Sequence, residues 1–308
     1  MTLSVSMVKE LREKSGAGMM DCKKALLETD GKIEEAIDWL RKQGLSAVAK
    51  KSSRVAAEGL IGVTVKDNQG ALIEINSETD FVARNKLFQD FVKTCSDLSL
   101  TCNEDIEILK QMQYPNTGRS VDQELANNIA TIGENMNVRR SKILKVSNGV
   151  IISYVHNNVA DGLGKLGVLV ALESNGDKDK LSSVGKQIAM HIAATSPKSL
   201  NIEDLDKDEV DRERQVLIDQ AVASGKPKEI AEKMVNGRML KYFQEVVLNE
   251  QVSVIDGETK IKDVVTRLQK DLDTDVKLAG FIFLKLGEGI EVSENDFAAE
   301  VAATAGIK

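Results

Sequence analysis

An acid and a large aromatic residue stand side by side at Asp80 and Phe81, where an alternating apolar pattern ends. The preceding segment, residues 71–76, alternates like a half-buried strand, which predicts that the pair lies on a turn between that strand and a helix. Turns lie at the surface, so the ring either folds back into the core or waits for a partner. The core is the commoner outcome for a lone Phe before a helix. In the alternative, the carboxylate can disturb a metal's ligands and the ring can wedge between a partner's helices.

The rest of the sequence offers little enzyme chemistry. His156 and His191 lie outside any HxxxH or Ser/His/Asp pattern, which favours structural roles. The stretch 162–165 is similar to a phosphate-binding loop, but Leu166 stands where a Ser or Thr would bind magnesium, so we interpret it as a hairpin loop. The acids between Asp204 and Glu209 lack the glycine and terminal glutamate of a calcium loop and suit helix capping. We therefore expect no catalytic, cofactor-binding or metal-ligating residues.

Composition indicates a soluble globular protein. The chain has 308 residues, enough for two or more domains, and its net charge of -7 argues against nucleic acid or an anionic membrane as the main partner. It lacks an apolar run of the ~20 residues that span a bilayer and an apolar signal segment at its start, so we expect a cytoplasmic location. Cys22, Cys95 and Cys102 show no CxxC spacing, which predicts reduced, packed thiols.

Residues 1–46 have the periodicity of a three-helix module. Breaks are predicted at 16–18, at 30–31 and at Gly44, where a left-handed glycine could end the third helix. Residues 47–57 are basic and irregular, and we interpret them as a linker. Met19 and Met20 are adjacent on a short helix, so either one of them offers a soft contact surface or both pack inward around a kink.

Beyond this linker the sequence predicts strands, and their order repeats. Two strands joined by a polar turn, residues 59–65 and 71–76, precede a helix, and 149–155 with 167–173 precede another. Segments 143–146 and 281–286 are candidates for a third strand in each sheet. This predicts an α+β core of two related halves, each an antiparallel sheet covered on one face by helices. The halves are 58–147, and 148–196 together with 243–287.

Residues 197–242 read as an antiparallel helical hairpin. Apolar residues recur near heptad spacing on both sides of Gly225 and Pro227, which favours a tight turn between two helices. Periodicity alone fits equally a hairpin that stands off the core and a helix pair packed flat on a sheet. The remaining segment, 288–308, is predicted to form a C-terminal module with a short Ala-rich helix.

Several motifs resemble the bacterial translation elongation factor Ts family, in the family's order. They are residues 8–11, GAGMMDCKKAL at 16–26, TDFVAR at 79–84, IGEN at 132–135, KPKEIAEKMVNG at 226–237 and DFAAEVAA at 296–303. The resemblance covers almost the whole chain. It implies a guanine-nucleotide exchange factor, not an enzyme, that binds elongation factor Tu with GDP and promotes GDP release so that GTP can rebind. It also implies an N-terminal module like a ubiquitin-associated domain and a hairpin of coiled-coil type.

The resemblance also implies roles for individual residues. Thr79, Asp80, Phe81 and Val82 match the motif that enters near the partner's magnesium and nucleotide. Two further sets match contact surfaces of the family: Val8, Leu11, Met19, Met20 and Lys23 in the first module, and Ile132 with Gly133. The resemblance implies no cofactor for this chain, because the GDP and the Mg²⁺ are bound to the partner.

Some questions stay open on the sequence. The segments 155–166 and 103–121 depart from the family pattern, which leaves their roles unassigned. Family members differ in whether the hairpin pairs two copies, so self-association stays an alternative. A general adaptor would bind elongation factor Tu without speeding GDP release, and a cryptic enzyme would lose turnover when His156 or His191 is replaced.

Overall fold

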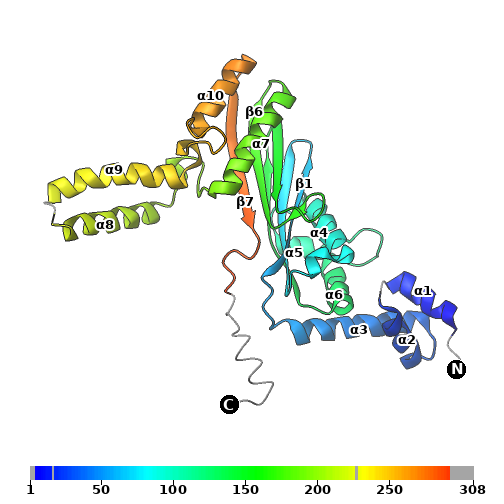
Figure 1. The fold of residues 1–308 in the computed structure, drawn as a ribbon. Coiled ribbons are helices and arrows are strands. Elements are labelled where there is room, and N and C mark those ends of the chain that lie inside the picture. The colour runs from blue at the N-terminus through cyan, green and yellow to red at the C-terminus, as the bar shows by residue number, and fades with distance from the viewer. Residues whose placement is uncertain (1–3, 16, 226–227, 292–308) are drawn as a thin grey trace.

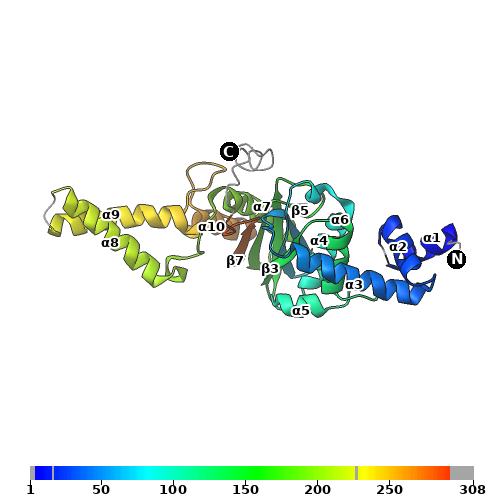
Figure 2. The ribbon, with the colours of Figure 1, turned by 90° about the horizontal axis from the view of Figure 1, so that it is seen from below.

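A computed structural model describes residues 4–15, 17–225 and 228–291 of the chain. Figure 1 shows a small helical module at the N-terminus, a central body of two β-sheets with helices on their outer faces, and a pair of long helices that extends away from the body. Figure 2 places the first module and the long helix pair at opposite ends of the molecule. The predicted α+β class is confirmed.

The elements follow in this order along the described chain. The helices are α1 (Val5–Ser15), α2 (Met19–Glu28), α3 (Ile33–Lys51), η1 (Val82–Arg84), α4 (Lys86–Ser99), α5 (Ile106–Gln111), α6 (Val121–Ile132), α7 (Lys178–Thr195), η2 (Ile202–Asp204), α8 (Lys207–Ala223), α9 (Lys228–Val246), η3 (Leu248–Glu250) and α10 (Ile261–Leu272). The strands are β1 (Glu58–Lys66), β2 (Gln69–Ser77), β3 (Met136–Lys145), β4 (Gly149–His156), β5 (Leu163–Gly164), β6 (Leu166–Ser174) and β7 (Val276–Lys285).

Both sheets are antiparallel and share one arrangement. The first has the order β3-β2-β1-β5 and the second β4-β6-β7, so each half places its second strand at the centre. The predicted hairpins are confirmed. A third strand lies at each predicted place, but β3 begins at Met136 and β7 at Val276, well before the predicted starts at 143 and 281. The stretch 162–165, interpreted from the sequence as a hairpin loop, lies in the connection between β4 and β6. It contains the short strand β5, which pairs with β1 of the other half.

A backbone detail repeats in both halves at the start of the first strand. Gly59 has φ +127° and Gly149 has φ +136°, a region that side chains rarely allow. A Cβ on Gly59 would stand 2.8 Å from the Cα of Asn76, and one on Gly149 would stand 2.9 Å from the Cα of Glu173. Each glycine therefore permits the central strand to approach its neighbour closely.

The two sheets pack face to face, and helices cover their outer faces. A cluster that includes Ile61, Leu72 and Leu169 fills the space between the sheets. A second cluster joins the first sheet to α4, α5 and α6, and a third joins the second sheet to α7 and α10. The prediction that residues 71–76 form a half-buried strand is wrong, because β2 is buried on both faces from Gly70 to Ser77.

The first module has its own small core, and its last helix is longer than predicted. Val8, Leu11, Cys22 and Leu26 are among the residues buried there. The prediction that Gly44 ends the third helix is wrong, since α3 continues to Lys51 and takes up much of the expected linker. Gly44 is buried, and a Cβ there would stand 3.7 Å from the carbonyl oxygen of Ala126. Gly44 therefore lies inside α3, at its contact with α6.

Helices α8 and α9 lie against each other and away from the sheets, as Figure 1 shows at the left. Ala221, Val235 and Met239 are buried in this part of the chain. The packing of the pair flat on a sheet, one of the two alternatives, is therefore wrong. Most of the predicted C-terminal module, including the Ala-rich helix, lies outside the described residues.

Candidate functional site

Phe81 is the most exposed large apolar side chain in the described part of the chain, at 77%. It follows the exposed Asp80, and the next two residues, Val82 and Ala83, are buried at 4% and 2%. The core interpretation of Phe81 is therefore wrong. The turn between β2 and η1 holds its apolar anchor inside and leaves an acid and a ring facing solvent.

The turn is hydrogen-bonded to a distant segment. The backbone N–H of Thr79 donates to Oε2 of Glu134 at 2.9 Å, and its hydroxyl donates to Oε1 of the same carboxylate at 2.7 Å. Glu134 follows Gly133, which ends α6 in the left-handed conformation with φ 93°. The structure thus joins two of the motifs that the sequence analysis treated separately.

A second connection runs beside the first. The backbone N–H of Asn135 donates to Oε1 of Glu78 at 2.5 Å, and the Arg54 guanidinium lies 3.4 Å from the same carboxylate. The side-chain amide of Asn135 in turn donates to the Arg54 carbonyl oxygen at 2.7 Å. Residues 78 and 79 are therefore both fixed to the segment 134–135.

Sequence reasoning missed Glu78, Glu134, Asn135 and Arg54 as parts of this site. The available signal is the IGEN motif, which contains Glu134 and Asn135 directly after the predicted contact residues Ile132 and Gly133. In the structure Gly133 is exposed and Ile132 is partly buried. Both lie directly before the two residues that hold the turn.

The predicted contact surface of the first module is only partly exposed. Met19, Met20 and Lys23 on α2 are exposed, the two methionines at 45% and 72%. Val8 and Leu11 were predicted to lie on this surface, but at 7% and 0% exposure they belong to the module's own core. They can support a contact surface on α2 from beneath, but they do not form it.

A buried carboxylate lies further along β2. Glu74 is fully buried and accepts hydrogen bonds from Arg139 at 2.9 Å, Arg140 at 2.5 Å, the Asn76 amide at 3.0 Å and the backbone N–H of Gly287 at 2.9 Å. Burial opposes ionisation most strongly, but these hydrogen bonds together hold the pKa of Glu74 below its ordinary value. The network connects the first sheet to the chain just beyond β7.

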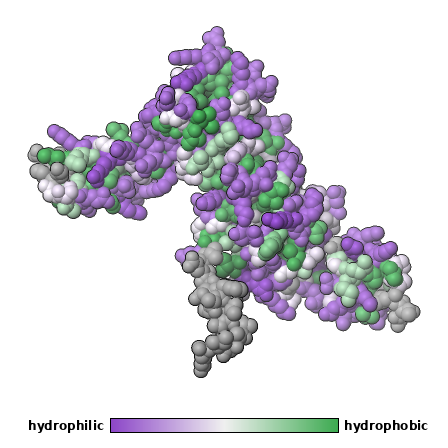
Figure 3. Space-filling model, viewed as in Figure 1, coloured by the Kyte–Doolittle hydropathy of each residue, from purple (hydrophilic) through white to green (hydrophobic). Residues whose placement is uncertain are grey.

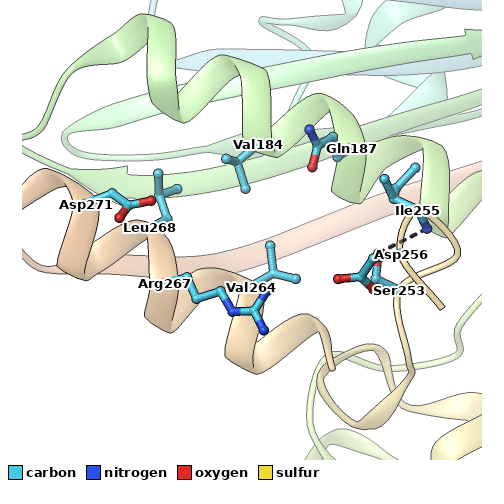
Figure 4. A pocket seen from close by; sticks show the side chains of 9 residues that line it. All are labelled: Val184, Gln187, Ser253, Ile255, Asp256, Val264, Arg267, Leu268 and Asp271. Atoms are coloured by element: carbon cyan, nitrogen blue, oxygen red, sulfur yellow. Dashed lines mark hydrogen bonds between the residues drawn. The ribbon is translucent and has the colours of Figure 1, made fainter. Parts of the chain in front are cut away.

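A cavity of about 160 Å³ opens between α7 and α10 (Figure 4). Its lining comprises Val184, Gln187, Ser253, Ile255, Asp256, Val264, Arg267, Leu268 and Asp271. The Thr259 hydroxyl and the backbone N–H groups of Thr259 and Glu258 hold the pKa of Asp256 at about 2. This carboxylate is therefore occupied within its own loop, and the lining offers no nucleophile paired with a base among the described residues.

An exposed apolar loop borders this cavity. Val252, Val254 and Ile255 are 42%, 50% and 52% exposed, and Figure 3 shows apolar surface near α10. Behind the loop, the buried His191 accepts a hydrogen bond at Nδ1 from the backbone N–H of Val254 at 3.2 Å. Nε2 of His191 then donates to Oε1 of Gln251 at 2.9 Å. Both ring nitrogens thus have structural roles.

The described residues contain neither a membrane-spanning helix nor a cluster of metal-ligating side chains. None of the helices within ranges 4–15, 17–225 and 228–291 is long and apolar enough to cross a membrane. The same part of the chain contains no group of three or more His, Cys, Asp or Glu side chains arranged to hold a metal ion. All three cysteines are buried and unpaired with each other.

Comparisons with known proteins agree on one family. The family model described as "Elongation factor TS" matches residues 78–288. A protein named Elongation factor Ts from Rhodospirillum centenum is 58% identical over 304 residues, which is 99% of each chain. Proteins of the same name from Rhodospirillum rubrum and Agrobacterium fabrum are 56% and 52% identical, each over 98% of both chains.

Proposed function

This chain belongs to the elongation factor Ts family, which implies a nucleotide-exchange role in translation elongation, and from this premise we propose that it acts on elongation factor Tu. In this proposal the protein binds elongation factor Tu with GDP, disturbs the magnesium and nucleotide site, and promotes GDP release so that GTP can rebind. It acts as an exchange factor on a GTPase and carries no cofactor of its own. The proposed place of action is the cytoplasm, without direct contact to nucleic acid or membrane.

The observation that supports this proposal is the exposed Phe81 next to Asp80 on a turn with a buried anchor. An exposed ring gains about 1.5 to 3 kcal/mol when a partner buries it fully, so it can supply binding energy at its point of entry. The adjacent carboxylate brings negative charge towards a metal site. Mg²⁺ bridges the phosphates of a bound nucleotide, and a small shift of its ligands removes several charge interactions together.

Exchange of this kind is reciprocal. The factor lowers the partner's affinity for GDP by a certain free energy, and GDP lowers the partner's affinity for the factor by the same amount. Contact surfaces beyond the turn therefore contribute, because they supply binding energy that offsets the lost nucleotide contacts. Met19, Met20 and Lys23 on α2, together with Ile132 and Gly133, are the candidates for such contacts.

The direct test is the release of fluorescent GDP from elongation factor Tu with catalytic amounts of this protein. The wild-type chain should accelerate release, and Phe81→Ala should lose most of the acceleration. Leu87→Ala is the matched control, since Leu87 is another exposed apolar residue at 51%, on the neighbouring helix α4. An unchanged release rate with the wild-type chain sinks the proposal, and binding without acceleration supports the adaptor alternative.

Thermal melts complete this test. Because Phe81 is 77% exposed, its replacement by alanine should change the free energy of unfolding by less than about 0.5 kcal/mol. Val82→Ala removes buried methyl groups and should cost about 2 kcal/mol.

Self-association through residues 197–242 is the remaining alternative for a second partner, and light scattering of the free chain measures it.

A further inference from the structure

Thr79 is committed to an internal contact. Its backbone N–H and its hydroxyl are its two hydrogen-bond donors, and Glu134 accepts both, at 2.9 and 2.7 Å. A carboxylate is an acceptor with two oxygens, so it matches this pair of donors without an unused group between them. Thr79 therefore anchors the turn from inside instead of offering its hydroxyl proton to a partner.

The anchor fixes one end of a short segment whose other end is fixed by burial. After Thr79, the carbonyl oxygens of Asp80 and Phe81 accept the N–H groups of Ala83 and Arg84 at 3.2 and 3.1 Å. Val82 then enters the core at 4% exposure. Only the side chains of Asp80 and Phe81 are left to project from a backbone that is held on both sides.

The position of Glu134 itself is set by the backbone. Gly133 takes φ 93° at the end of α6, which turns the chain sharply towards β3. The next residue along, Asn135, holds Glu78 through its backbone N–H, so residues 78 and 79 are each tied to a different residue of the same bend. This cross-connection prevents the turn from pivoting about a single contact.

We propose that Glu134 is a positioning residue for partner binding, which holds Thr79 and thereby presents Asp80 and Phe81 in one fixed geometry. The inference rests on the proposed function, because it concerns how the same turn meets its partner. A contact group that is ordered before binding loses less conformational freedom on association. Loss of Glu134 therefore weakens binding through Phe81 and leaves the chemistry at the partner's nucleotide site unchanged once the complex has formed.

The first experiment measures GDP release against the concentration of this protein for Glu134→Ala and Glu134→Gln. The glutamine can keep both contacts, because its oxygen can accept the Thr79 backbone N–H and its NH₂ group can donate to the Thr79 hydroxyl oxygen. For Glu134→Ala we expect the half-saturating concentration to rise roughly tenfold, which corresponds to about 1.4 kcal/mol, while the rate at saturation stays within about twofold. For Glu134→Gln we expect a smaller rise, because the two-point contact with Thr79 is retained. Glu107→Gln is the control, since Glu107 is 76% exposed on α5 and should behave as wild type.

The second experiment combines Glu134→Ala with Phe81→Ala. If Glu134 acts through the position of Phe81, its loss should add little to the defect of Phe81→Ala, because the two effects are then strongly non-additive. If Glu134 instead touches the partner directly, the two defects multiply. Multiplied defects, or a half-saturating concentration within about twofold of wild type for Glu134→Ala, overturn the proposal.

The third experiment uses the free protein and does not depend on exchange activity. Amide hydrogen exchange of residues 78–85 should become faster in Glu134→Ala and in Thr79→Val, while the melting temperature of each variant stays close to wild type. Unchanged protection of this segment contradicts the positioning role. If the wild-type chain fails to release GDP while this segment still loosens in the variants, the proposed function fails and the anchoring by Glu134 stands.

Discussion

The Arg119 guanidinium donates a hydrogen bond from Nη1 to the carbonyl oxygen of Ser15 at 2.9 Å, which joins the loop before α6 to the last residue of α1. Nε of Arg119 also contacts Glu124 at 2.6 Å, so the side chain is held from its own side. The carbonyl groups at a helix C-terminus lack partners within the helix and carry partial negative charge. A cation there connects the first module to the core.

Arg119→Met should therefore loosen the first module. The methionine keeps the apolar stem but removes a hydrogen bond between a charged group and a helix end, for which about 1.5 kcal/mol is expected. Limited proteolysis should cut α1 and α2 faster in the variant, while α4 and α7 stay protected. Arg212→Met on the exposed side of α8 is the control, and equal cleavage rates in both variants would contradict the linkage.

Replacement of glycine by alanine should change the free energy of unfolding in opposite directions at Gly149 and at Gly237. Gly149→Ala places a Cβ against the backbone of β6 at a positive φ and should cost more than about 1 kcal/mol. Gly237→Ala, in α9 with no atom within 4 Å of the new Cβ, should stabilise the protein by about 0.5 to 1 kcal/mol. Urea denaturation measures both changes, and equal signs would show that the close approach at Gly149 is relieved by relaxation.

Removal of the Glu74 charge should destabilise the core. Glu74→Gln removes the buried carboxylate that Arg139 and Arg140 share, although Arg140 keeps its contact with Glu288 at 3.3 Å. About 1.5 to 3 kcal/mol is expected for loss of hydrogen bonds to a charged group. Because the pKa of Glu74 is lowered, its contribution is present above its ordinary value of 4.5 and is lost as the pH falls through the folded-state pKa. Acid titration of unfolding stability should therefore lose its steepest part in the variant, and an unchanged profile would rule out this assignment.

His191 should make stability depend on pH in a higher range. Burial lowers its pKa below the ordinary 6.5, with the Gln251 hydrogen bond opposing, so the unfolded chain binds the proton more readily. The free energy of unfolding should thus fall as the pH drops below 6.5 and level off below the folded-state pKa. His191→Gln should flatten this slope between about pH 5.5 and 7, whereas a variant of the exposed His156 should keep it.

Local signals in the sequence predicted much of the fold. Polar turn residues and alternating apolar runs identified both hairpins, because strand and turn preferences act over a few residues. Gly44 shows where such signals fail, since a glycine that ends a helix and one inside a helix that packs on another look the same in sequence. The distinction depends on Ala126 of α6, far along the chain.

The candidate site was predicted only in its exposed part. Asp80 and Phe81 could be selected because an acid and a ring at a strand end are unusual neighbours. Their support could not, because Thr79 and Glu134 are 55 residues apart and meet only after β3 pairs with β2. Val8 and Leu11 show a different failure. They belong to a motif of the family, but they are buried in the core beneath the exposed surface of α2.

Because the two halves are similar, a central strand could pair with the third strand of the wrong half. The β-bulges of the two sheets, after Glu74 in β2 and after Ala171 in β6, differ in their residues. At equivalent positions the first half has Glu74 opposite Arg140 with Arg139 as the extra residue, and the second has Ala171 opposite Gly280 with Ala279. If β3 and β7 exchanged places, the buried Glu74 would face small residues. Arg139 and Arg140 would then lie beside Ala171 without a carboxylate partner on the central strand. The contacts of Glu74 with Arg139 and Arg140 therefore favour the pairing of β2 with β3 over a pairing of β2 with the similar strand β7.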